Sequence, residues 1–275
     1  MKKNFRSMRR YTIAVLVTAA ACLASGCAKK EVSVEVVSGA ENENKPQISI
    51  NENKPQISIQ ENPAALFLKI TAEYDSDWQD EHSLISTKTS QIRILDEDHA
   101  ELQKALDALN QKNLDSQSTF MADNQADARQ MYQDKPELME NNGWESELTL
   151  TAVRADETVL CLRQTDYSWL GGAHPNTCIT GITYDTQTGA ELSLKDIAND
   201  YDGIYEYVLE RLAKEHDPNM FFEQYEDAVK AMFYGGDADY SPVHWSLTNE
   251  GVTIWFNQYD IAPYAAGSVS VEIPF

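Results

Sequence analysis

The sequence predicts an α+β protein in which an antiparallel sheet has helices packed on one side. The apolar residues change period along the chain in the order strand, helices, strands, helices, strands, which favours this architecture. The last residues, 269–275, alternate apolar and polar side chains, as expected for a strand with one buried face. The folded part runs from about residue 64 to residue 275, which is long enough for one domain or two small interlocked ones.

The chain begins with cationic residues 2–10, an apolar run at residues 11–23 and small residues before Cys27. That order is typical of a secretory signal peptide, and an apolar run of about 13 residues is too short for a permanent membrane helix. A cysteine at this place resembles the bacterial lipobox. We therefore expect a lipoprotein signal peptide at residues 1–26, a lipid on Cys27, and anchoring to the extracellular face of the cytoplasmic membrane. A plain secreted protein and an uncleaved anchor are the alternatives.

Residues 27–63 are predicted to be a disordered tether. The nonapeptide NENKPQISI at residues 42–50 is repeated without change at residues 51–59. Two polar repeats that each contain a proline cannot build the shared core of a solenoid. An extended linker that holds the folded part away from the membrane fits this composition.

The charge of the chain is strongly acidic, with 22 basic and 44 acidic residues and a formal net charge of -22. Removal of residues 1–26 takes away five basic residues and no acidic one, so 17 basic residues remain against 44 acidic ones, a net charge of -27. Such a field repels nucleic acid and anionic headgroups and attracts cationic proteins and metal ions. The alternative is that the acidic surface merely keeps an exported protein soluble.

The first half of the folded part is predicted to contain a strand and two helices. β-Branched residues indicate a strand at residues 84–95, and Asp96 then offers an N-cap. Leucines 102, 106 and 109 recur at helical spacing, and a second helix is expected at about residues 122–138, ending near Gly143.

Three strands are expected next, at residues 148–153, 159–165 and 177–184, with Asp156 and Glu157 in a turn. The segment DTQTG at residues 185–189 is typical of a type I turn whose last residue is left-handed.

The chain then becomes helical again. Ser193 and Asp196 resemble a capping box, and apolar stripes predict two helices, one before Pro218 and one before Gly235. The stripe residues are Ile204, Val208, Leu209 and Leu212, then Phe221, Tyr225, Ala228, Val229 and Met232. A turn at residues 249–251 leads into a strand at residues 252–256.

Two cysteines, Cys161 and Cys178, flank the loop between two predicted strands almost symmetrically. Outside the membrane a disulfide between them is permitted. The alternative is two small buried apolar residues, which is how unpaired cysteine usually behaves.

The sequence contains none of the tested enzyme motifs: no HExxH, no GxSxG and no glycine-rich phosphate loop. The five histidines are scattered singly, which argues against a hydrolytic metal site. The acidic residues Asp200 and Asp202 before Gly203 do not fit the spacing of an EF-hand, and a helix-start aspartate is the simpler interpretation. We therefore expect no catalytic site, metal or cofactor.

The loop GGAHPNT at residues 171–177 is the first candidate ligand-binding segment, through Gly171, Gly172, His174 and Asn176. Its glycines allow backbone angles that are closed to other residues, so the loop can expose its amides and His174. The alternative is a tight connection in which His174 and Asn176 bond to nearby backbone.

The loop YDIAPYAAG at residues 259–267 is the second candidate, through Tyr259, Asp260 and Tyr264. Aromatic rings beside a carboxylate suit recognition of sugar or protein, and they equally suit a packed corner.

These segments together resemble a known family. The motifs GGAHPNT, LSLKDI at residues 192–197, the run from residue 252 to residue 267, and the ending IPF resemble the RsiV-like extracytoplasmic domain. Residues 83–142 are similar to the companion domain of the peptidoglycan deacetylase PdaC. The resemblance implies two α+β segments, residues 64–143 and 144–275.

In that family the RsiV-like domain serves as a lysozyme receptor, and in PdaC the related region accompanies a catalytic domain. We find neither a cytoplasmic sigma-binding segment nor a deacetylase domain in the sequence. The resemblance therefore implies a non-catalytic lipoprotein of the Gram-positive cell envelope that binds lysozyme or peptidoglycan. The alternatives are an accessory or catalytic peptidoglycan-modifying protein and a structural lipoprotein.

Overall fold

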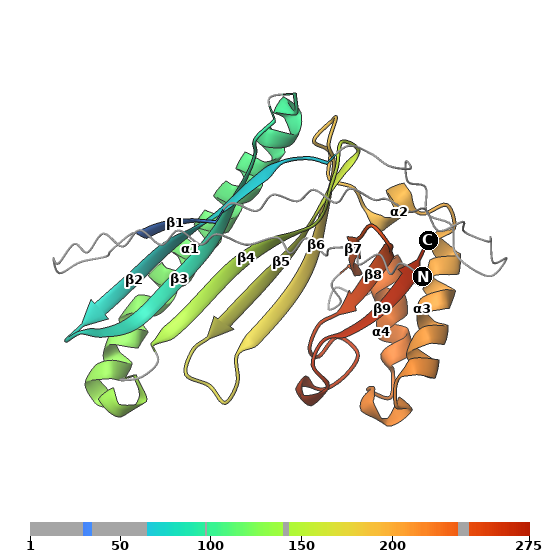
Figure 1. Cartoon of the computed structure of the whole chain (residues 1–275). Coiled ribbons are helices and arrows are strands. Elements are labelled where there is room, and N and C mark those ends of the chain that lie inside the picture. The colour runs from blue at the N-terminus through green and yellow to red at the C-terminus, as the bar shows by residue number, and fades with distance from the viewer. Residues whose placement is uncertain (1–29, 35–64, 97, 140–142, 236–241) are drawn as a thin grey trace, which may run out of the picture.

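The computed structural model describes residues 30–34, 65–96, 98–139, 143–235 and 242–275 (Figure 1). They form a six-stranded sheet and a three-stranded sheet with helices, so the predicted α+β class is confirmed. The predicted signal peptide, Cys27 and both copies of the nonapeptide lie outside the described residues.

The six-stranded sheet has its strands in sequence order, and all neighbours are antiparallel except β3 and β4, which are parallel. Its strands are β1 (Lys30–Val34), β2 (Leu68–Gln79), β3 (His82–Ile94), β4 (Trp144–Ala155), β5 (Val159–Trp169) and β6 (Asn176–Asp185). Part of the predicted tether, Lys30–Val34, is therefore a strand that pairs with β2. The boundary expected between residues 143 and 144 falls inside this sheet.

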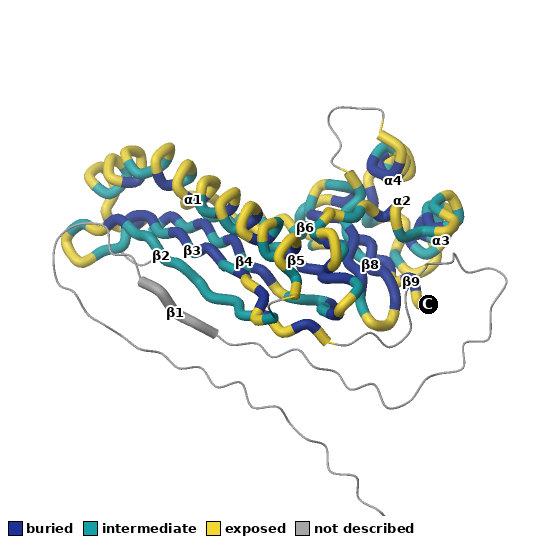
Figure 2. The backbone as a smooth tube through the Cα atoms, turned by 90° about the horizontal axis from the view of Figure 1, so that it is seen from above, coloured by how far each residue is buried: buried dark blue, intermediate teal, exposed yellow. Residues whose placement is uncertain are grey.

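A single long helix, α1 (Ala100–Asp134), lies across one face of the sheet (Figure 2). The prediction of two separate helices here was wrong, because the helix continues through Asn113 and Gln117, two buried polar residues. Their amides donate to Gln164 and Ser146 on the sheet, each at 3.0 Å, so these polar positions belong to the buried face. Asp96 does not cap the helix, which has His99 at its N-cap; the Asp96 carboxylate accepts from the backbone N–H of Phe67 instead.

Two amide side chains of α1 complete the backbone hydrogen bonding of β3 where that strand separates from β4. The β3–β4 ladder ends at Thr89 and Leu148. Beyond it, Asn110 Oδ1 accepts from the backbone N–H of Ile92 at 2.9 Å and Asn110 Nδ2 donates to the Ile92 carbonyl at 2.8 Å. Gln103 Oε1 accepts from the N–H of Ile94 at 2.8 Å. The helix thus satisfies groups that would otherwise be buried without hydrogen bonds.

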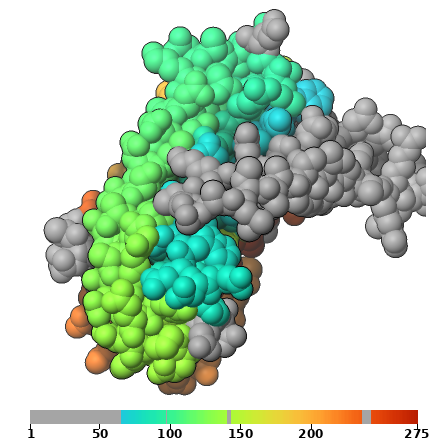
Figure 3. Space-filling model, turned by 90° about the vertical axis from the view of Figure 1, so that its left-hand side faces the viewer, coloured from blue at the N-terminus to red at the C-terminus, as the bar shows by residue number. Residues whose placement is uncertain are grey.

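The far half of α1 is fixed to the β2–β3 hairpin by an ion pair. Arg129 bonds Asp77 through two contacts of 2.7 Å, and the Asp77 side chain is only 5% exposed. This bond from the guanidinium of Arg129 holds the pKa of Asp77 below its usual range. Figure 3 shows this side of the molecule, where α1 (green) lies beside the hairpin (cyan). A 3-10 turn, Pro136–Leu138, follows α1.

The C-terminal part forms a second core around β7 (His244–Leu247), β8 (Gly251–Phe256) and β9 (Val269–Pro274). One face of this sheet packs against α3 (Tyr201–Glu215) and α4 (Tyr225–Tyr234), which follow the short helix α2 (Leu194–Ile197) and are joined by the 3-10 turn Pro218–Met220. The predicted stripes are confirmed, since Ile204, Val208 and Leu212 of α3 are fully buried. The predicted alternation in β9 is confirmed by the buried residues Val269, Val271 and Ile273.

The two sheets meet on the face of β5 and β6 that points away from α1. An ideal Cβ at Gly181 of β6 would lie 1.5 Å from the carbonyl oxygen of Trp245, so glycine is required for β7 to cross there. The Cys161 Sγ accepts from the backbone N–H of Leu247 at 3.2 Å. The buried pair Arg154–Asp156, at 2.6 Å, lies beside this interface, and Arg154 also donates to the Thr248 carbonyl.

The predicted turn at residues 185–189 and the capping pair Ser193 and Asp196 are confirmed. The Asp185 carboxylate accepts from the backbone N–H groups of Gln187 and Thr188, and Gly189 has a φ of +68°. The Asp196 carboxylate accepts from both the backbone N–H and the hydroxyl of Ser193.

The disulfide considered between Cys161 and Cys178 is wrong, because both cysteines are free. In the β5–β6 register Cys161 lies opposite Thr183, whereas Cys178 lies opposite Asp166. Five strand positions separate the two sites, about 17 Å at the rise of a strand, well beyond the span of a disulfide. The two side chains also point to opposite faces. Cys161 is buried, as the alternative expected, and Cys178 is exposed.

Candidate functional site

The two loops selected from the sequence lie at the same end of the molecule, at the bottom of Figure 1. One joins β5 to β6 and the other joins β8 to β9. We call residues 169–176 and 257–267 together the two-loop surface. The contact between them is a stack of the His174 and Tyr264 rings, whose centroids are 3.7 Å apart at an interplanar angle of 21°.

The β5–β6 loop is shaped by its aromatic and glycine residues. Trp169 Nε1 donates to the carbonyl of Gly172 at 3.1 Å, which closes the turn. Gly171 has a φ of +77°, a conformation that favours glycine. Leu170 is 45% exposed at the tip, and Gly172 and His174 are exposed as well. The loop therefore presents apolar surface and an imidazole ring to solvent.

The β8–β9 loop is fixed at its start by Asn257. Its side chain accepts from the N–H of Ile179 at 2.7 Å and donates to the carbonyl of the same residue at 3.0 Å, so it binds the backbone of β6. The Asp260 carboxylate accepts from the backbone N–H of Asn257 at 2.6 Å. Ile261 and Ala262 are buried, and the 3-10 turn Tyr264–Ala266 follows. The loop is thus a packed corner whose tyrosines remain at the surface.

Tyr259 is held in an exposed and unfavourable backbone conformation. It is 55% exposed and has a φ of +71°, which is uncommon for a residue other than glycine. Its ring centroid lies 6.1 Å from that of Tyr264, which in turn stacks on His174. The three rings form one aromatic row across both loops. Strained, exposed residues of this kind tend to occur at functional sites.

Three acidic residues lie on elements next to the aromatic row: Glu145 opposite Trp169 on β4, Asp166 on β5 and Asp260 in the β8–β9 loop. Tyr167 donates from its hydroxyl to Glu145 at 2.8 Å, and this bond raises the pKa of Tyr167. Burial raises the pKa of Asp260 and lowers that of the neighbouring His244. Burial also raises the pKa of the Cys178 thiol, with a further contribution from the nearby charges of Asp166 and Asp260. This end of the molecule therefore carries acidic residues, and burial shifts Asp260 toward its neutral form.

The structure brings together most of the residues selected from the sequence: Gly171, Gly172, His174, Tyr259, Asp260 and Tyr264. Asn176 is exposed at the start of β6, opposite Ser168. The alternative of a tight connection is met in part, because His174 Nδ1 lies 3.0 Å from the Pro175 carbonyl oxygen.

Sequence reasoning missed three contributors, namely Glu145, Tyr167 and Trp169. Tyr167 and Trp169 lie four and two residues before Gly171, so aromatic residues close to the glycines were an available signal.

The remaining site expectations concern metals and membranes. Within the described ranges, no group of three or more His, Cys, Asp or Glu side chains is placed to hold a metal ion. Asp200 is the N-cap of α3 and accepts from the backbone N–H of Gly203 at 2.8 Å, as the simpler interpretation expected. Among the residues that the structure describes, no helix combines the length and apolar character needed to cross a membrane.

Comparison with known proteins gives two family matches. Residues 194–275 match a family described as "Protein of unknown function (DUF3298)", and residues 87–177 match one described as "Deacetylase PdaC". The second match extends from β3 to the start of β6 and so crosses the boundary expected at residues 143 and 144. No curated protein matches the chain.

Two solved structures are similar in fold. A DUF3298 family member from Bacteroides fragilis NCTC 9343 is 15% identical, with a TM-score of 0.57, over 78% of this chain and 92% of that one. A DUF3298 family protein from Pseudomonas aeruginosa PAO1 is 19% identical, with a TM-score of 0.49, over 76% of this chain and 90% of that one.

Proposed function

We propose that this chain, which matches the DUF3298 and PdaC family models in part, is a non-catalytic, lipid-anchored envelope protein that binds an extracellular cationic protein of the lysozyme type. The aromatic row of His174, Tyr264 and Tyr259 on the two-loop surface carries this proposal. Two loops that are far apart in sequence converge there on an exposed apolar surface with acidic residues nearby.

The composition of the surface suits a basic protein partner. Tyrosines supply rigid contact area at low cost in conformational entropy, and they are enriched at the centres of protein interfaces. The carboxylate of Glu145, which accepts from Tyr167 at this end of the molecule, complements a positive surface, and the net charge of -22 attracts such a partner over a longer range. Association should therefore be fast at low salt and slower as salt rises.

The experiment is a titration of the purified mature protein with hen lysozyme at several ionic strengths. We expect saturable binding at low salt, a slower association rate at higher salt, and a loss of about tenfold or more in affinity for Tyr259→Ala, since central aromatic residues often contribute ~2 kcal/mol. His174→Ala should also weaken binding, because it removes the stack on Tyr264.

The matched control is Phe67→Ala, which removes an aromatic residue that is 43% exposed and lies outside the two-loop surface. Its affinity for lysozyme should equal that of the unchanged protein. Absence of saturable binding at low salt would end this proposal, and so would equal losses for Phe67→Ala and Tyr259→Ala.

An enzyme that acts on peptidoglycan is the second candidate, and it is favoured by the description "Deacetylase PdaC" of the matched family. His174 is the residue of the two-loop surface best suited to proton transfer near neutral pH. Release of product from purified cell wall, abolished by His174→Ala but retained by Phe67→Ala, would support this candidate over the first.

A further inference from the structure

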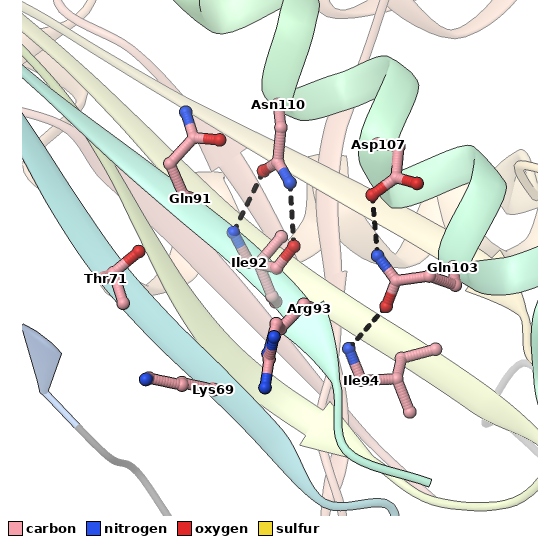
Figure 4. A pocket seen from close by; sticks show the side chains of 9 residues that line it. All are labelled: Lys69, Thr71, Gln91, Ile92, Arg93, Ile94, Gln103, Asp107 and Asn110. Atoms are coloured by element: carbon pink, nitrogen blue, oxygen red, sulfur yellow. Dashed lines mark hydrogen bonds between the residues drawn. The ribbon is translucent and has the colours of Figure 1, made fainter. Parts of the chain in front are cut away.

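A second site lies at the opposite side of the six-stranded sheet, in a pocket of about 520 Å³ between β2, β3 and α1 (Figure 4). Its strand side consists of two cross-strand pairs, Lys69 opposite Arg93 and Thr71 opposite Gln91. Its helix side is formed by Gln103, Asp107 and Asn110. The volume falls within the range of sites for small molecules.

Two cations face each other across this hairpin, Lys69 half-buried and Arg93 exposed. Lys69 and Arg93 are direct partners in the β2–β3 register, an arrangement that destabilises a sheet because like charges repel. Within the described residues, neither side chain forms an ion pair with an acidic group. In a chain with twice as many acidic as basic residues, two neighbouring cations that pair with no acidic group of the described ranges are available to bind an external anion.

The other polar groups of the pocket are consistent with an anionic ligand. Gln91 Nε2 is buried and makes no hydrogen bond within the described structure, so it is an unsatisfied donor. Thr71 adds a hydroxyl on the same side of the hairpin. The one carboxylate among the lining residues, Asp107, lies across the pocket on α1 and accepts from Gln103 Nε2 at 2.7 Å. Asn110 and the Gln103 oxygen are occupied by the backbone of β3.

We propose that this pocket binds a small molecule through an anionic group, a carboxylate or a phosphate, held between Lys69 and Arg93. The planar guanidinium of Arg93 can bind two oxygens of such a group side by side, and Lys69 supplies a second positive charge. Thr71 and Gln91, the next cross-strand pair on the same face of the hairpin, supply a hydroxyl and an amide as neutral donors beside the two cations. The pocket does not include any residue of the two-loop surface, so this proposal is independent of the proposed function.

The probes are sodium phosphate, sodium acetate and acetamide, titrated into isotopically labelled mature protein at constant ionic strength and followed by the backbone amide resonances. Acetamide has nearly the shape of acetate but no charge. We expect saturable shifts at residues 69–71 and 91–94 with phosphate or acetate and none with acetamide. The tighter of the two anions identifies the class of the natural ligand.

Arg93→Gln and Lys69→Gln should each weaken anion binding about tenfold or more, because hydrogen bonds to charged groups contribute at least ~1.5 kcal/mol. The matched control is Lys104→Gln, which removes a cation from the exposed surface of α1. It should change the affinity less than about twofold, as expected for an exposed charge. Shifts that do not saturate, or that persist in Arg93→Gln, would overturn the proposal.

The stability of the ligand-free variants gives a second measurement. Because Lys69 and Arg93 repel each other, Arg93→Gln and Lys69→Gln should unfold at the same temperature as the unchanged protein or at a higher one. Added anion should stabilise the unchanged protein and not the variants. A lower unfolding temperature in both ligand-free variants would assign the two cations a structural role and refute a binding role.

Discussion

Loss of the Asp77–Arg129 ion pair should destabilise the protein in a pH-dependent way. Asp77 is almost fully buried, with a side chain 5% exposed, whereas Arg129 is 51% exposed. Removing one member of a fully buried ion pair lowers the free energy of unfolding by ~3–5 kcal/mol. We expect a smaller loss of ~2 kcal/mol here, because solvent can hydrate the arginine that has lost its partner. Asp77→Asn keeps the shape of the side chain and removes its charge.

Equilibrium unfolding in urea at pH 7 measures this change. With a denaturant dependence of about 2 kcal/mol per molar urea, a loss of ~2 kcal/mol lowers the unfolding midpoint by about 1 M. The melting temperature should fall by roughly 4–8 °C for a protein of this size. The ion pair contributes much of the stability of the second half of α1, because that half has few buried apolar side chains, chiefly Met121 and Ala128.

The pH dependence follows from the lowered pKa of Asp77 in the folded state. A carboxyl group whose folded pKa lies below its unfolded value of 3.8 stabilises the fold fully above that value and loses the effect as pH falls through the folded pKa. The difference between the unchanged protein and Asp77→Asn should therefore be constant from pH 8 to about pH 5 and shrink below about pH 4.

Asp75→Asn is the matched control, because it removes the same charge from the same strand. Within the described part of the chain, the Asp75 carboxylate accepts from the backbone N–H of Ser76 and pairs with no cation. It should shift the midpoint by less than about 0.3 M, in keeping with the small effect of surface substitutions. The reasoning is refuted if Asp77→Asn unfolds at the midpoint of the unchanged protein, or if the difference between them stays constant down to pH 3.

Three further outcomes are expected. Gly181→Ala should destabilise the protein by ~3 kcal/mol or more in urea unfolding, because the added Cβ would lie 1.5 Å from the Trp245 carbonyl oxygen. The control is Gly172→Ala, whose Cβ would meet nothing closer than 3.8 Å. Equal unfolding midpoints for the two variants would contradict the packing of β7 on β6. Asn110→Ala should lower the free energy of unfolding by ~2 kcal/mol, because both backbone groups of Ile92 lose their hydrogen bonds to this side chain. The control Asn124→Ala loses one hydrogen bond within α1 and should lower the free energy of unfolding by less than half as much. A thiol reagent followed by peptide mapping should label Cys178 in the folded protein and Cys161 only on unfolding, because Cys178 is exposed and Cys161 is buried. Labelling of both at the same rate would contradict this assignment.

Most local signals in the sequence predicted local structure correctly, the N-cap expected at Asp96 being the exception. The turn at residues 185–189, the capping pair Ser193 and Asp196, and the apolar stripe of α3 depend on neighbours within a few positions, so the pattern alone decides them. Strand β9 was predictable for the same reason, since its alternating side chains have one buried face.

Strand pairing and helix continuity depended on distant residues. Strand β2 was not predicted because its side chains are mostly polar and half-buried, and it becomes a strand by pairing with β3. The middle of α1 looked like a break because Asn113 and Gln117 are polar, yet both are buried against amide and hydroxyl groups of the sheet. A periodicity analysis counts such residues as exposed, and only the position of the sheet reverses that assignment.

The sequence by itself determined which residues of the candidate site have suitable chemistry: a histidine loop rich in glycine and a loop with two tyrosines and an aspartate. The tertiary structure decided that these loops form one surface, because β7 crosses β6 at Gly181 and Asn257 binds the backbone of Ile179, which brings Tyr264 onto His174. The same register separates Cys161 from Cys178 and places Lys69 opposite Arg93. Pairing between strands fixes these distances, and no local pattern encodes them, because a shift of one residue moves every side chain to the other face.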